Sequence, residues 1–134
     1  MDKIVNDITL SVQVQPTIGG SVSSSALIDT SLYRRAVISA ALHKLPDAKG
    51  EGVATLTVYE STAATWNGAV ATAISGAAAT ASLTSASNVI LQYELRNSQQ
   101  SSTKRYIGAY LTLPTSCVNS IIVERGRRRY QNTV

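Results

Sequence analysis

The feature that most constrains the fold is an alternation of side chains within Gly52–Trp66 (GVATLTVYESTAATW). Every second position of its first half is apolar: Ala54, Leu56 and Val58. The positions between them hold Val53, Thr55, Thr57 and Tyr59. Successive side chains of a β-strand point to opposite faces of a sheet, so this period of two predicts a strand with one buried face. Val, Thr and Tyr suit such a half-buried surface, which strengthens the prediction.

Other segments are also predicted to be strands. They are Asp7–Gln15, Leu32–Leu42, Asn88–Asn97, Lys104–Leu113 and Val118–Arg125. In the first, the apolar side consists of Ile8, Leu10, Val12 and Val14. We expect Pro16 to end that strand, because proline cannot donate to a ladder of hydrogen bonds. A helix is the alternative for Leu32–Leu42, since Ala and Leu are good helix formers, but the β-branched pair Val37-Ile38 favours a strand.

The segment Ser61–Ser87 consists almost wholly of Ala, Ser, Thr and Gly. We predict two weak strands here, Ala69–Ile74 and Ala79–Leu83, joined by a turn at Ser75-Gly76. An unstructured loop is the alternative. Small, uncharged strands specify their register poorly and need cover from a partner, so we expect a contact between subunits in this segment.

Together these segments predict an all-β protein, an antiparallel β-sandwich or jelly roll, because no amphipathic helix separates the strands. A chain of 134 residues is expected to form one domain with a true core. We predict an N-terminal strand and Gly/Ser-rich linker over 1–25, the sandwich over 26–125, and a basic tail over 126–134. The N-terminal strand is predicted to fold back onto its own sheet. Adding to the sheet of a neighbouring subunit is the alternative.

The sequence predicts no catalytic, cofactor-binding or metal site. The only histidine and the only cysteine, His43 and Cys117, have no nucleophile motif around them, and two such residues are too few for a structural zinc site. Glu51, Glu60 and Glu94 are interpreted as surface acids. The phosphate-binding and dinucleotide-binding glycine motifs are absent from the sequence. We therefore expect a protein that is not an enzyme and takes no small-molecule substrate.

Two features instead predict contacts with a partner. The net charge of +4 is concentrated near the end of the sequence, where Tyr130 follows Arg125, Arg127, Arg128 and Arg129. Arginine pairs well with carboxylates on a protein partner, while nucleic-acid binding and a merely solvated tail are the alternatives. The only tryptophan, Trp66, is predicted to cover the edge of the core, and an exposed anchor on a partner surface is its alternative.

The order of motifs resembles a known group of proteins. Tyr33-Arg34-Arg35 opens a strand, Thr55–Trp66 reads TLTVYES-x4-W, a small-residue stretch follows, and Lys104–Ile107 opens a late strand. Over about Leu32–Val123 this pattern is similar to small β-sandwich structural proteins of tailed bacteriophages, capsid decoration (cement) proteins among them.

The resemblance implies a protein that is made in the host cytoplasm and binds the outside of an assembled phage head. Its partners would be the major capsid protein and copies of itself, with no membrane contact and no cofactor. The contacts are predicted at the N-terminal strand, Trp66 and the basic tail, that is at Ile8, Leu10, Val12, Val14, Trp66, Arg125, Arg127, Arg128, Arg129 and Tyr130. A neck, tail or fibre protein and a carbohydrate-binding module are the alternatives.

Overall fold

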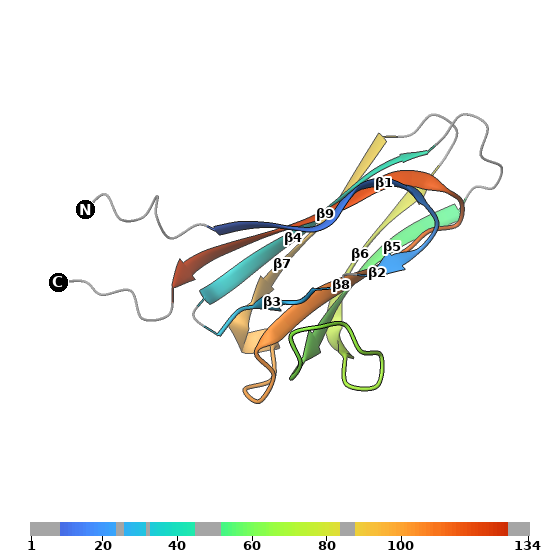
Figure 1. Ribbon diagram of the computed structural model, residues 1–134. Coiled ribbons are helices and arrows are strands. Elements are labelled where there is room, and N and C mark those ends of the chain that lie inside the picture. The colour runs from blue at the N-terminus through green and yellow to red at the C-terminus, as the bar shows by residue number, and fades with distance from the viewer. Residues whose placement is uncertain (1–8, 24–25, 32, 45–51, 84–87, 129–134) are drawn as a thin grey trace, which may run out of the picture.

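The computed structural model describes residues 9–23, 26–31, 33–44, 52–83 and 88–128. Within them the strands form two layers (Figure 1). Sheet A has the order β1-β9-β4-β7, and sheet B has the order β2-β8-β5-β6 with β3 also on β8. Every strand pairing is antiparallel, so the predicted antiparallel β-sandwich is confirmed. The bounds are β1 Thr9–Gly19, β2 Val22–Ser23, β3 Ile28–Asp29, β4 Tyr33–Lys44, β5 Gly52–Ser61, β6 Thr72–Leu83, β7 Asn88–Arg96, β8 Tyr106–Thr112 and β9 Cys117–Arg128, with a 3-10 turn η2 at Asn97–Gln99.

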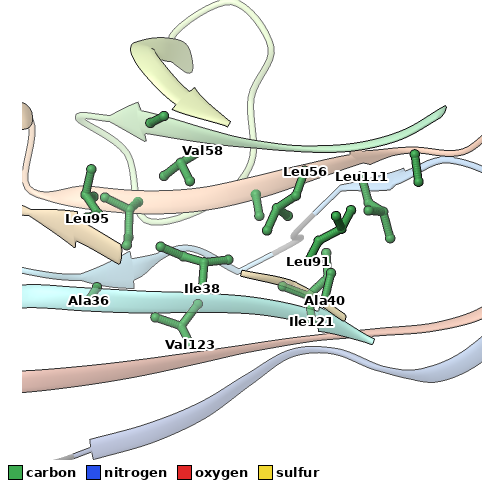
Figure 2. Packing of buried hydrophobic residues seen from close by; sticks show 14 of the residues in the cluster. Ala36, Ile38, Ala40, Leu56, Val58, Leu91, Leu95, Leu111, Ile121 and Val123 are labelled. Atoms are coloured by element: carbon green, nitrogen blue, oxygen red, sulfur yellow. The ribbon is translucent and has the colours of Figure 1, made fainter. Parts of the chain in front are cut away.

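The core lies between the two sheets, where the apolar side of each alternating strand points inward (Figure 2). Ile38 of β4 and Ile121 of β9 come from sheet A, and Leu56 of β5 and Leu111 of β8 come from sheet B. All four are fully buried. The alternation of β4 is therefore that of a strand, and the helical alternative for this segment is wrong.

Strand β1 differs from the prediction at Pro16, which does not end it. β1 lies at the edge of sheet A as described, where one side of the strand needs no ladder donors, and an edge is where proline is tolerated. The register also shifts between Val12 and Val14 and again between Val14 and Thr17. The predicted linker Thr17–Ser25 is likewise wrong in part, because β1 continues to Gly19 and β2 then joins sheet B.

Strand β6 is one element, not the two weak strands that the sequence predicts. Thr57 lies opposite Ala78, whereas Tyr59 lies opposite Ala73, so β6 bulges between these pairs. Within the bulge Ile74 is buried and Gly76 has a φ of 77°, a left-handed conformation that glycine adopts without a steric cost. The predicted turn at Ser75-Gly76 is therefore a bulge, and the side chains of Ile74 and Ala77 on either side of it are part of the core.

Strand pairing joins the predicted segments. β1 pairs with β9 of the same chain, which confirms the prediction that the N-terminal strand folds back onto its own sheet. β9 extends to Arg128, so the strand includes the first residues of the predicted tail over 126–134.

A matched pair of isoleucines tests the position of the core. Ile38 is fully buried, and Ile90 of β7 is 72% exposed. We expect Ile38→Ala to lower the free energy of unfolding by about 2–5 kcal/mol, because it removes buried methyl groups and leaves a cavity. Ile90→Ala should change it by less than about 0.5 kcal/mol. Urea unfolding measures both values, and equal effects would contradict the assignment of inner and outer faces.

Candidate binding surfaces

The outer face of sheet A exposes apolar side chains. Leu10 is 64% exposed and Val12 is 55% exposed, and both belong to edge strand β1. Val12 lies opposite Ile122 of β9, so the two side chains share the outer face. At the other edge of the sheet, Ile90 projects from β7 on the same face, opposite Ala41 of β4. We refer to Leu10, Val12, Val37, Ile90 and Ile122 as the sheet A surface.

Charges lie among these apolar side chains. Arg35 of β4 and Glu94 of β7 form an exposed ion pair with a nitrogen-to-oxygen distance of 3.6 Å. Glu124 of β9 lies opposite Leu10 and Val37 in the register of sheet A. The sheet A surface therefore combines apolar side chains with charges of both signs.

The structure brings only part of the predicted contact set together. Leu10 and Val12 are exposed, but the register shift after Val12 turns Val14 toward the core, against which it packs. Ile8, Arg129 and Tyr130 lie outside the described residues. Arg127 and Arg128 belong to the end of β9, where only the backbone is described.

Arg125 joins the two sheets and is not a free tail cation. Its guanidinium donates to the backbone carbonyl of Asp29 in β3 at 2.8 Å and lies 4.7 Å from the ring centre of Tyr33. It also reaches the hydroxyl of Ser11 in β1 at 3.5 Å. Arg125 therefore fastens β9 of sheet A to β3 of sheet B at one end of the sandwich, a role that its place in a run of arginines did not suggest.

Polar groups at the same end tie loops to strands. The Thr30 hydroxyl donates to the side-chain carbonyl of Gln100 at 2.7 Å, and the backbone N–H of Ser101 donates to the Glu60 carboxylate at 2.7 Å. A hollow of about 50 Å³, lined in part by Thr30 and Gln100, lies between them. It has room for about one or two water molecules, so it does not fit an organic substrate.

The Asp29 carboxylate is the most perturbed acid in the described part of the chain. It forms an ion pair with Arg105 and accepts the backbone N–H of Ser31 at 2.9 Å. Partial burial alone would raise its pKa, but these hydrogen bonds favour the charged form and lower the pKa from 3.8 to about 2.

A cluster of three aromatic rings lies on the outer face of sheet B. The Trp66 ring lies 5.2 Å from that of Tyr59 in β5, with an angle of 71° between the planes. It lies 6.3 Å from the ring of Tyr110 in β8, at 31°. Tyr59 and Tyr110 alternate with the buried residues Val58 and Ala109, so both point outward. The prediction that Trp66 covers an edge of the core is therefore wrong, because it is half-buried on the outer face of a sheet.

The residues weighed for catalysis do not converge. Cys117 points into the core, where burial raises the pKa of its thiol. His43 of β4 lies opposite Val118, is exposed on the other face of sheet A and is hydrogen-bonded to Asn88. Glu60 in sheet B is buried, so its interpretation as a surface acid is wrong, whereas Glu94 is exposed on the outer face of sheet A and Glu51 lies outside the described residues. Among the described residues, His, Cys, Asp and Glu do not gather in threes that would hold a metal ion. Nor do the described elements include a helix long and apolar enough to cross a membrane.

Comparisons with known proteins show the fold. No protein-family model matches the sequence, and no curated protein matches it. Among solved structures, a chain of infectious bursal disease virus, Gx strain, superposes with a TM-score of 0.52 at 11% identity, over 92% of this chain and 32% of that one. A chain described as CBM4 structure and function gives 0.47 at 10% identity, over 90% and 71%. A chain of Bacillus endospore appendages, a family of disulfide-linked pili, gives 0.38 at 15%, over 90% and 88%. This chain thus spans about a third of the viral chain, whose sandwich it shares.

The pKa of Asp29 predicts how acid affects stability. Because the pKa is lowered on folding, the charged carboxylate stabilises the fold above pH 4 or so, and this contribution is lost as the pH falls from about 4 to about 2. We expect Asp29→Asn and Arg105→Gln each to flatten the dependence of the melting temperature on pH in that window. Arg34→Gln, which removes an exposed cation elsewhere, is the control and should keep the wild-type dependence. An unchanged profile for Asp29→Asn would show that the pair does not stabilise the fold.

Proposed function

We propose that the protein is a non-enzymatic virion structural protein, a capsid decoration protein that binds the outside of an assembled phage head. The observation that carries the proposal is the sheet A surface. Its apolar side chains at Leu10, Val12 and Ile90 are 64%, 55% and 72% exposed. Val12 also lies beside Ile122 across β1 and β9, and exposed apolar side chains that lie together suit a contact with another molecule.

The position of β1 adds a second kind of contact. As an edge strand of the described sheet, β1 has one side without a strand partner, and backbone N–H and C=O groups on such a side pair readily with a strand of another chain. Apolar side chains and unpaired backbone groups therefore lie next to each other at this edge. We infer that the shell, or a second copy of the protein bound to it, covers both.

The kind of partner is supported by the resemblance to phage structural proteins and by the sandwich shared with a chain of infectious bursal disease virus. A protein that binds only assembled shells stabilises them by mass action, because every bound copy lowers the free energy of the assembled state. Such a role needs a stable scaffold and a contact surface, and it needs no reactive groups.

Two exposed valines give a matched test of this surface. Val12 on sheet A is 55% exposed and Val53 on sheet B is 54% exposed. We expect Val12→Asp to weaken binding to heads that lack the protein by about tenfold or more, because it places a charge in the apolar contact. Val53→Asp should leave binding unchanged. Cosedimentation of the purified variants with heads measures the affinity.

Thermal unfolding of both variants checks that the fold is kept, since exposed substitutions usually alter stability by less than about 0.5 kcal/mol. Failure of the wild-type protein to cosediment with heads would disprove the proposed function. Equal weakening by Val12→Asp and Val53→Asp would disprove the assignment to the sheet A surface.

A further inference from the structure

The outer face of sheet B has a different chemistry from the sheet A surface. The register of the sheet aligns hydroxyl side chains across strands, with Thr55 of β5 between Thr112 of β8 and Thr80 of β6. In the next row, Thr57 lies opposite Tyr110. These side chains are half-buried or exposed. A row of hydroxyl groups therefore runs beside the aromatic cluster.

These hydroxyl groups are available to a ligand. Thr55, Thr57 and Thr112 make no side-chain hydrogen bond with other residues that the structure describes. A hydroxyl group both donates and accepts hydrogen bonds, so a row of them matches a ligand that carries hydroxyl groups itself.

Charge is missing from this part of the face. The outward positions of β5 from Val53 to Tyr59, and those of β8 from Gly108 to Thr112, hold no ionisable acid or base other than tyrosine. At one end of the face Arg105 pairs with Asp29, and the ammonium group of Lys104 donates to the neutral hydroxyl of Thr72 at 2.8 Å and keeps its charge. The face therefore suits a neutral ligand, whereas an anionic ligand would find no free cation among these outward side chains.

The aromatic cluster supplies an apolar platform. Tyr59 and Tyr110 hold the half-buried Trp66 from two strands, at 5.2 and 6.3 Å between ring centres. The face of an aromatic ring carries partial negative charge, and it attracts the weakly positive C–H groups of a sugar. Apolar ring contacts combined with a few hydrogen-bonding groups are the usual composition of a ligand site.

From this combination we propose that the outer face of sheet B binds a neutral carbohydrate chain, with a sugar packed on Trp66 and its hydroxyl groups bonded to the row that includes Thr55 and Thr112. The proposal does not depend on the decoration function, because it concerns the opposite face of the sandwich. If the sheet A surface binds the shell, the outer face of sheet B points away from the shell.

Trp66 reports on its own site, since it is the only tryptophan. We would titrate the full chain with three neutral polysaccharides, a soluble glucan, a mannan and a galactan, and with the acidic polymer polygalacturonate. At least one neutral polymer should shift the tryptophan emission and retard the protein in a native gel, and polygalacturonate should do neither. Binding of polygalacturonate alone, or of no polymer, would overturn the proposal.

Variants separate a binding role of Trp66 from a packing role. Trp66→Ala should weaken retardation by the neutral polymer about tenfold or more. Thr112→Glu leaves the rings in place and adds a charge at an exposed position, so it should weaken binding as well while the melting temperature stays unchanged. Val12→Asp on the opposite face should bind like the wild type.

If Trp66→Ala does not fold, Thr112→Glu decides, and wild-type affinity of Thr112→Glu would overturn the proposal. Dimers in solution that Thr112→Glu dissolves would also overturn it, because they would show that this face binds a second copy.

Discussion

Close packing of small against branched side chains between the two sheets is the constraint on which the rest of the structure depends. On β4, Ala36 and Ala40 alternate with Ile38 and Leu42, and all four are buried. Small side chains make room for large ones from the facing sheet, so the layers interdigitate at the density of a protein interior. The sequence contains no phenylalanine, and the aromatic cluster around Trp66 lies outside the core. Aliphatic side chains thus fill most of the core, and the Trp66 cluster lies outside it.

This arrangement gives the two outer faces different chemistry. Sheet A presents apolar side chains with charges of both signs, such as the pair of Arg35 with Glu94. Sheet B presents aromatic rings and hydroxyl groups, and the outward positions of β5 are uncharged. A sandwich that is thin and filled by aliphatic residues can carry two such surfaces without either one disturbing the core. The function of the molecule is therefore expected at its faces and not in an internal pocket.

The central strands were predictable from sequence, and the edge strands were only partly so. In β5 and β8 the core side chains follow the local alternation, because each of these strands pairs with a neighbour on both edges and its register is fixed. In β1 and β6 the register shifts, and one side of each strand is free of a partner in the described sheets. Local sequence does not say that an edge will accept Pro16 or that Ile74 will turn inward through a bulge.

Prediction from local sequence has the same limit at the candidate sites, because contacts between distant residues are not visible in it. Leu10 and Val12 are exposed on the outer face of sheet A, so their assignment to a partner contact stays a prediction. Trp66 was singled out for the wrong face, because its neighbour Tyr110 is far away in the sequence and only the pairing of β5 with β8 brings the rings together. The signal in the sequence that could have indicated this cluster is Tyr110, an aromatic residue at an outward position of β8. The contact of Arg125 with β3 could not be predicted for a similar reason, since Asp29 is 96 positions away.

The place of β9 has a consequence for how the molecule is made. β9 is the last described strand in the chain, yet it lies between β1 and β4, and it holds Thr9 beside Arg125. During synthesis β1 emerges before β9 and stays without its neighbour until the strands between them have been made. Such distant pairings make folding slow, and unfinished sheets with bare edges aggregate readily. A nascent chain that ends before β9 would therefore leave β1 without its neighbour and one edge of β4 unpaired.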